Sequence, residues 1–276
     1  MITNLPSAGP LDLSVYNPGM EAIFQVSSTL IMGKNEALLI DAQFAGQDAQ
    51  ALAELVRGSG RELGVIYISH GDPDYYFGLG VMREAFPKAR IQATQATIDH
   101  IRETRDDKLK TWGPKLGPNA PERIIMPDLA PCRGLELEGA ALEIIGLDGP
   151  TPDRSFIWIP SVRAVVGGIP VVSGEHVLMA DTPTPESHHH WLQTLERIRS
   201  LNPEIVVPGH RLPESPCTMA AVDFTEAYIR AYDQEAAKAK DSGELIQGMT
   251  ARFPGLAGLP NLELSAQVSL GEMQWS

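Results

Sequence analysis

Apolar positions follow two different spacings along the first hundred residues, which indicates strands that alternate with helices. Short apolar runs rich in β-branched residues predict strands at residues 22–32, 37–41, 63–69 and 91–93. Longer segments with apolar residues at helical spacing predict helices at residues 46–58 and 78–86. This half of the chain therefore has the element order of a layered α/β fold.

The second half has a different order of elements. Strands are predicted at residues 135–137, 141–147, 156–159, 164–166 and 205–207, with a helix after Glu186 and a helical segment at about 218–250. A strand hairpin followed by helices is inconsistent with a purely parallel, doubly wound sheet. The apolar spacing of the C-terminal helical segment indicates that it covers a sheet or a second subunit, so a homo-oligomer is an open expectation.

Residues 104–121, between the two halves, are rich in Gly and Pro. This composition predicts a loop, and its length predicts a lid-like insertion at about residues 98–130. Trp112 and Lys115 are candidate substrate-binding residues here, because an indole can stack on a substrate and an ammonium can pair with an anionic group. A surface loop anchored by a buried Trp112 is the alternative interpretation.

Length, composition and charge narrow the class of protein. With 276 residues and 43% hydrophobic content, the chain can bury the core of one compact domain, residues 1–276, without a disulfide or structural metal. The formal net charge of −13 opposes binding to phosphate backbones, so no nucleic-acid partner is expected. The N-terminus lacks a basic segment followed by an apolar run, and no stretch approaches the length of a membrane span. We therefore expect a cytoplasmic protein without a membrane partner.

Candidate chemistry is concentrated in residues 69–78, which read SHGDPDYYFG. His70, Asp72 and Asp74 alternate at the C-terminal end of a predicted strand, where the active sites of layered α/β folds commonly lie. A tight turn at Gly71 and Pro73 would aim these three side chains into one cavity as possible metal ligands. A polar turn in which Asp74 caps the next helix also explains the triplet.

The order of several further segments resembles the metallo-β-lactamase superfamily. Residues 70–75 (HGDPDY) match the family's HxHxDH metal loop, and residues 35–41 resemble its early strand, which ends in an aspartate that supports the loop, here Asp41. Residues 149–152 (GPTP) resemble its GHTP turn, residues 156–168 its hairpin ending in GD, and residues 203–210 the segment carrying its last metal histidine. The resemblance spans about residues 20–212. It implies an αββα sandwich of two mixed β-sheets flanked by helices.

The metal ligands that the resemblance implies are incomplete in this chain. The family's seven ligand positions fall on His70, Asp72, Pro150, Asp74, Tyr75, His210 and Gly168. Proline and glycine have no side-chain donor, so the resemblance implies at most one catalytic metal ion per chain. Restoring histidine at positions 72, 75 and 150 and aspartate at 168 should recreate a two-zinc site, provided that the backbone accepts the changes.

Two hypotheses about the metal follow. In the first, His70, Asp72, Asp74 and His210 hold one divalent ion, zinc before iron or manganese, with an open position for water. In the second there is no metal and these groups form a hydrogen-bonded polar cluster, because two carboxylates in one loop repel each other unless a cation or protons neutralise them. Many relatives carry a histidine after the hairpin near the substrate, so His176 is a candidate ligand or substrate contact; a loop histidine bonded to backbone is its alternative.

The resemblance implies a small-molecule hydrolase of esters, lactones, thioesters or amides. The catalytic candidates are Asp72, Asp74, Tyr75 and His176. Asp72 would position or deprotonate a water that the bound cation activates, and Tyr75 would donate to the developing oxyanion. Two other classes stay open: a metal-free ligand-binding protein or pseudoenzyme, and a metal-free enzyme that uses the cluster as acid and base.

Overall fold

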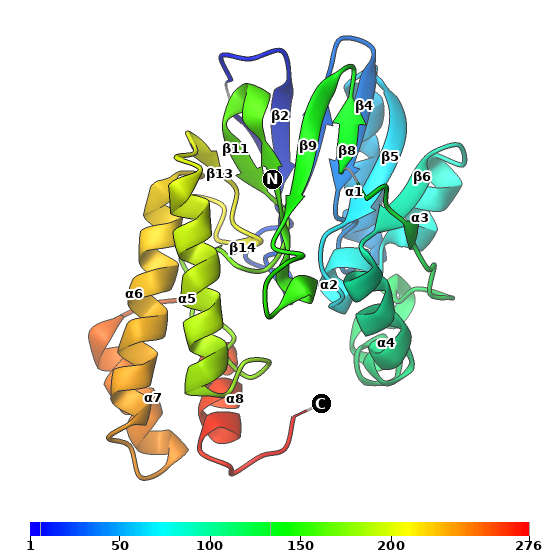
Figure 1. Cartoon of the computed structure of the whole chain (residues 1–276). Helices are drawn as coiled ribbons and strands as arrows, with labels where there is room; N and C mark the ends of the chain where they lie inside the picture. The colour runs from blue at the N-terminus through cyan, green and yellow to red at the C-terminus, as the bar shows by residue number, and fades with distance from the viewer. Residues whose placement is uncertain (6, 133, 276) are drawn as a thin grey trace.

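Two β-sheets lie face to face between two groups of helices (Figure 1). The computed structural model describes residues 1–5, 7–132 and 134–275. The first sheet contains seven strands in chain order: β1 (Ile2–Leu5), β2 (Asp12–Tyr16), β3 (Ser28–Met32), β4 (Glu36–Ile40), β5 (Glu62–Ile68), β6 (Arg90–Ala93) and β7 (Asp128–Leu129). Strands β1 to β4 pair antiparallel, and β4 to β7 pair parallel. The first sheet is therefore mixed.

The second sheet is built from the other half of the chain. Its five strands are, in spatial order, β13 (Ile205–Val206), β11 (Ala164–Val166), β10 (Phe156–Ile159), β9 (Ala140–Ile145) and β8 (Leu135–Leu137). Only the β11–β13 pair is parallel. A separate two-stranded parallel sheet joins β12 (Val172–Ser173) to β14 (His210–Arg211) beside the site.

Helices cover the outer face of each sheet, as Figure 1 shows. The first sheet is covered by α1 (Gly46–Gly58), α3 (Leu79–Ala85) and α4 (Gln95–Leu116). The second is covered by α5 (Pro185–Ser200), α6 (Met219–Ala236), α7 (Ser242–Arg252) and α8 (Leu259–Ser269). A short helix α2 (Pro73–Tyr76) and the 3₁₀ turns η1 (Gly117–Asn119), η2 (Pro152–Arg154) and η3 (Pro160–Val162) complete the described elements.

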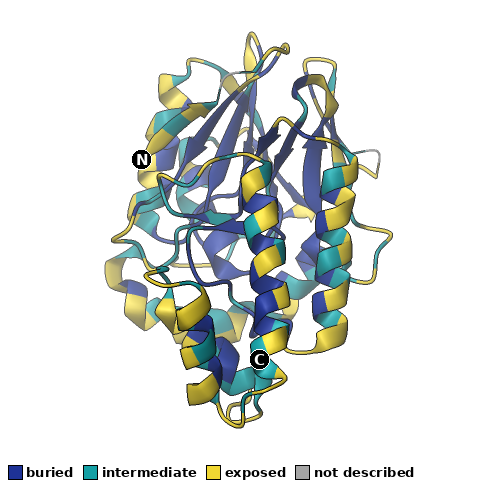
Figure 2. Cartoon of the chain, turned by 90° about the vertical axis from the view of Figure 1, so that its left-hand side faces the viewer, coloured by how far each residue is buried: buried dark blue, intermediate teal, exposed yellow. Residues whose placement is uncertain are grey.

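The alternating directions of side chains along the central strands explain why each sheet has one face toward the other sheet and one face toward helices. Leu38 and Ile40 of β4 point into the core between the sheets, whereas Leu39 points toward the helices, because successive side chains of a strand face opposite sides. A strand buried on both faces is apolar along its buried length, and β5 shows this pattern from Val65 to Ile68. Figure 2 shows the strands of the sheets as largely buried, whereas the helices carry both buried and exposed positions. The expected αββα sandwich is thus confirmed.

Most predicted elements agree with the structure, but two regions do not. The strand predicted at 22–32 begins only at Ser28, and the sequence did not predict β1 and β2 before it. The helix at 46–58 and the strands at 135–137, 156–159 and 164–166 have the predicted bounds. The predicted loop at 104–121 is wrong, because helix α4 continues to Leu116. The charged residues before Trp112 are good helix formers, and Gly113 and Pro114 fall in the last turn, where a helix is about to end.

The C-terminal helices pack on the second sheet, which is one of the two expectations for this segment. Among the residues described, no helix is both long and apolar enough to cross a bilayer.

Candidate functional site

A chain of buried hydrogen bonds positions the loop that follows β5. The carboxyl group of Asp41, at the end of β4, accepts the Ser69 backbone N–H at 2.8 Å and the Ser69 hydroxyl at 2.6 Å. The Ser69 hydroxyl oxygen accepts the backbone N–H of Gly168 at 2.7 Å, which ties the loop to the turn after β11. Burial raises the pKa of Asp41 to about 7, although the Ser69 donors oppose the shift. Both sheets therefore fix the start of this loop.

The first cluster of charges surrounds Asp72. Its Oδ2 lies 3.1 Å from Nε2 of His70, and its Oδ1 lies 3.3 Å from Nζ of Lys108. His100 of the same helix α4 places its Nε2 3.8 Å from Oδ1. Asp72 precedes α2 and makes no capping hydrogen bond with its side chain, so it acts in this cluster and not as a helix cap.

The second cluster centres on His210 of β14. Its Nε2 lies 2.9 Å from Oδ2 of Asp74, and its Nδ1 lies 3.6 Å from Oε1 of Glu175. Asp74 sits in the first turn of α2, past the cap position, so the interpretation of Asp74 as the helix cap is wrong. Segments far apart in the sequence thus converge on one imidazole.

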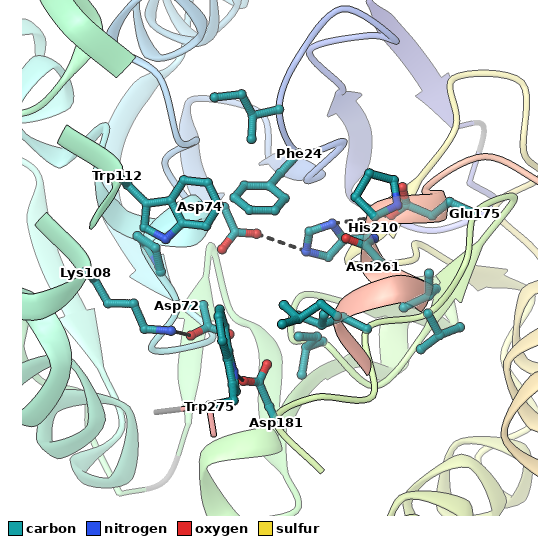
Figure 3. Close-up of a pocket in the computed structure, with 18 of the residues that line it drawn as sticks. Phe24, Asp72, Asp74, Lys108, Trp112, Glu175, Asp181, His210, Asn261 and Trp275 are labelled. Carbon is teal, nitrogen blue, oxygen red and sulfur yellow. Dashed lines mark hydrogen bonds and ion pairs between the residues drawn. The ribbon is translucent and has the colours of Figure 1, made fainter. Parts of the chain in front are cut away.

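Both clusters open on one pocket, which Figure 3 shows in close-up. Its volume is about 390 Å³. The polar part of its lining includes Asp72, Lys108, Asp74, His210 and Glu175, together with Thr111, Lys115, Asp181 and Asn261. The remaining lining is mainly apolar and aromatic and includes Phe24, Trp112, Ile169, Leu178, Trp191 and Trp275. Concave sites with apolar walls and a few convergent polar groups are typical of small-molecule binding.

The charges of the first cluster stabilise one another. Burial disfavours the Asp72 carboxylate, but His70 and Lys108 outweigh this effect and hold the pKa of Asp72 well below its usual range. Burial also disfavours the His70 imidazolium, yet the charge and hydrogen bond of Asp72 raise the pKa of His70 above its ordinary value. For Lys108, burial is likewise outweighed by Asp72 and Asp181, so its pKa is raised. Asp72 is therefore held as an anion between cations.

The second cluster behaves differently. For His210, burial disfavours the charged form, but Asp74 and Glu175 outweigh it and raise the pKa. Burial raises the pKa of Glu175, and the His210 charge offsets this only in part. A carboxyl group that keeps its proton to higher pH than usual is a candidate general acid.

The family's metal positions are a poor fit for a metal ion here. Both Asp72 oxygens already face cationic groups, and His70 Nδ1 faces the backbone carbonyl of Asp153 at 3.1 Å. The hydroxyl of Tyr75 is buried and has no hydrogen-bond partner among the described residues. Burial and the nearby Asp74 raise its pKa well above its ordinary value, which disfavours the phenolate that a metal ligand requires. Within the described part of the chain, no three His, Cys, Asp or Glu side chains are arranged to hold an ion.

The other predicted site residues are divided between the pocket and the core. Trp112 and Lys115 line the pocket, with the Lys115 ammonium 4.1 Å from the centre of the Trp112 ring. His176 is buried, and its Nδ1 lies 2.9 Å from the hydroxyl of Tyr228, toward the C-terminal helices. It does not line the pocket, so a substrate contact by His176 has no geometric support.

Sequence reasoning missed several pocket residues, among them Lys108, Glu175 and Trp275. Lys108 lies on α4, seven residues before Lys115. Seven residues make about two helical turns, so the two lysines share one face of the helix, and this spacing is the signal that could have indicated Lys108. The indole N–H of Trp275 donates to Asp181 at 2.6 Å and so brings the segment after α8 to the pocket. No motif marks this residue, because its position depends on how the C-terminal helices pack.

Comparisons with known proteins identify the family and the fold. The profile described as "Metallo-beta-lactamase superfamily" matches residues 22–210, which is more than half of the chain. A curated "Beta-lactamase-like protein 2 homolog" of Caenorhabditis elegans is 29% identical over 93 residues, which are 34% of this chain and only 28% of that protein. The chain therefore matches well under two thirds of that relative's length.

Solved structures share the fold at low sequence identity. A metallo-beta-lactamase family protein from Thermus thermophilus has a TM-score of 0.67 and 15% identity over 94% of this chain and 91% of its own. The metallo-beta-lactamase from Pontibacter korlensis has a TM-score of 0.62 and 14% identity over 83% and 99%. The DIM-1 metallo-beta-lactamase has a TM-score of 0.59 and 17% identity over 83% and 97%. With the matching profile, the sheet order and the position of the loop, these likenesses lead to one conclusion: the chain belongs to the metallo-β-lactamase superfamily.

Proposed function

We propose that this protein is a hydrolase of small carboxylic acid derivatives (esters, lactones, thioesters or amides) that uses its own acid and base groups where relatives use metal ions. The observation that supports this most is the placement of two carboxylate–imidazole pairs, Asp72 with His70 and Asp74 with His210, at one largely apolar pocket. Paired carboxylates and imidazoles in a water-poor site are the usual machinery of general acid–base catalysis. The family membership is consistent with a hydrolase but does not identify the substrate.

Asp74 is the better base of the two loop carboxylates. The pKa of Asp72 is held well below its usual range by its cationic neighbours, so it is a weak proton acceptor. Asp74 uses one oxygen on His210 and lines the pocket, as Figure 3 shows, which allows its other oxygen to accept a proton from water. The water oxygen then attacks the carbonyl carbon.

Glu175 is the corresponding acid. It lines the pocket beside His210, and burial raises its pKa, so it can protonate the leaving group when the carbon–heteroatom bond breaks. Asp74 ends the cycle protonated and Glu175 ends it ionised, and proton exchange with solvent through the pocket resets both groups. His210 holds the two carboxyl groups in place between its ring nitrogens.

No step of this mechanism passes through a metal, because the donor set described above does not fit one. Tyr75 is not assigned a contact with substrate, since its hydroxyl is buried and the residue does not line the pocket.

A competing function is ligand binding without turnover. The specific observation in its favour is the Asp72 cluster, in which both carboxylate oxygens are engaged by side chains of the protein. Such a cluster can fix the shape of a pocket without taking part in a reaction.

Hydrolysis of a panel of esters, lactones, thioesters and amides, beginning with 4-nitrophenyl acetate, tests the proposal. We expect turnover by the wild type and a fall in kcat of about 100-fold in Asp74→Asn, which keeps the shape of the side chain and removes the base. Lys34→Gln, at a position that does not line the pocket, is the control. Tight binding of panel members with no turnover would favour the ligand-binding function instead.

A further inference from the structure

Lys108 combines three properties that are unusual for a lysine. Its side chain is only 13% exposed, its Nζ is 3.3 Å from Asp72, and it lines the pocket. The Trp275 ring is a second neighbour of the ammonium, with 5.6 Å between Nζ and the ring centre. Burying an ammonium costs free energy unless its donors find partners, and Asp72 and the indole face account for two directions of the head group. An ammonium has three N–H donors, so one donor is left for the pocket.

The location of Lys108 is informative because Asp72 stands where the family has a metal ligand. In such a centre a cation would lie against the side chain at this position. Here the group against Asp72 Oδ1 is the Lys108 ammonium, which is delivered by the rigid helix α4. The protein thus places a fixed positive charge of its own at the polar end of the pocket.

We propose that Lys108 is a catalytic residue of the pocket, whose ammonium hydrogen-bonds the substrate carbonyl oxygen and stabilises the oxyanion that forms there. This inference rests on the proposed hydrolase function. As the water oxygen bonds to the carbonyl carbon, the π electron pair moves onto the carbonyl oxygen, where the ammonium stabilises it; when the C–O, C–S or C–N bond to the leaving group breaks, that pair re-forms the carbonyl. Lys108 keeps its proton throughout.

Lys115 is the natural comparison, because it is on the same helix and lines the same pocket. It is exposed, and its ammonium lies over Trp112 instead of beside Asp72. An exposed ammonium remains hydrated and has little effect on charge that develops deep in the pocket. The structure therefore favours Lys108, which the sequence did not single out, over Lys115, which it did.

Binding of two small probes tests the assignment without requiring turnover. Monoethyl phenylphosphonate is a tetrahedral monoanion that imitates the oxyanion intermediate, and benzamide is a planar neutral analogue of the substrate. Their dissociation constants are measured by titration calorimetry for the wild type, Lys108→Met, Lys108→Arg and Lys110→Met. Circular dichroism shows which variants are folded, and Lys108→Gln serves if Lys108→Met is not.

We expect the wild type to prefer the phosphonate, and Lys108→Met to lose about 100-fold in phosphonate affinity while benzamide affinity changes by less than about threefold. Lys108→Arg should keep most of the preference, and Lys110→Met, at an exposed position of α4 that does not line the pocket, should keep all of it. Equal losses for both probes would show a purely structural role and overturn the proposal. It would also be overturned by a wild type without the preference, or by a preference lost in Lys110→Met. If the phosphonate preference depends on Lys108 but no ester is hydrolysed, the hydrolase function fails and the anion-binding role of Lys108 stands.

Discussion

His210 Nε2 and Asp74 Oδ2 lie 2.9 Å apart, although Asp74 belongs to the half of the chain that forms the first sheet and His210 follows the second. Such a bond between distant segments is not a local turn interaction. It means that the site forms only when both halves have folded and packed, and that the protonation of one imidazole depends on the whole fold.

The first prediction concerns pH. Because the folded protein raises the pKa of His210, protonated His210 contributes stability that is fully present below the unfolded pKa of about 6.5 and is lost as pH rises through the folded pKa. Urea unfolding between pH 6 and 9 should show a smaller pH dependence for His210→Gln than for the wild type. An unchanged dependence in the variant would contradict the prediction. His189→Gln, an exposed histidine of α5, is the control.

The second prediction concerns the Asp72 cluster. Asp72→Asn leaves Lys108 and His70 without their anionic partner in a site where the carboxylate is 12% exposed. We expect the free energy of unfolding to fall by about 3 kcal/mol, as in other buried pairs that lose one partner. Glu54→Gln breaks the exposed pair with Arg57 and should cost less than about 1 kcal/mol. Similar values for the two variants in denaturant titrations would refute the idea that the cluster is coupled.

The third prediction concerns metal content. Protein purified without chelator or added metal should contain at most one ion per chain, because Pro150 and Gly168 carry no donor and the loop carboxylates have partners in the protein. Elemental analysis by mass spectrometry measures the content. Added zinc should leave the thermal midpoint unchanged, since an ion that binds the folded state raises it. Two ions per chain would show that the ligand positions are wrongly matched.

The fourth prediction concerns restoration of the family's ligands. The backbone does not accept an aspartate at position 168, where φ is +76° and a Cβ atom would lie 2.3 Å from the carbonyl oxygen of Ser155. Gly168→Asp should therefore lower stability by about 2 kcal/mol or more, and adding Asp72→His, Tyr75→His and Pro150→His should not recreate a two-zinc site. Gly80→Ala, a helical position with open space around its Cβ, should be neutral or stabilising. Two bound zinc ions in the fourfold variant would contradict this expectation.

The sequence predicts the fold well because the elements that build it are periodic. Strands such as β10 and β11 are short apolar runs whose bounds depend on local composition. Helix α4 is harder to predict, because its Gly and Pro residues resemble a loop. Leu109 and Leu116 pack against the core of the first sheet and so favour the helix in this segment.

Only the part of the candidate site that stands at strand ends can be predicted from the sequence. Residues 70–75 and His210 stand at strand ends, where position along the chain indicates position in the site. Lys108 and Trp275 reach the pocket from a helix face and from the segment after α8. Their places depend on side-chain packing between elements, which leaves no pattern in a single sequence.

The bonds from Asp41 to Ser69 and from Gly168 to Ser69 have an evolutionary consequence. They hold the loop in position through carboxyl, hydroxyl and backbone groups, none of which stands at one of the family's metal-ligand side-chain positions. Substitutions at positions 72, 75 and 150 leave this support intact, so each ligand can be replaced without first destroying the loop. A chain that keeps Asp41 and Ser69 can therefore vary at these positions while the start of the loop stays in place.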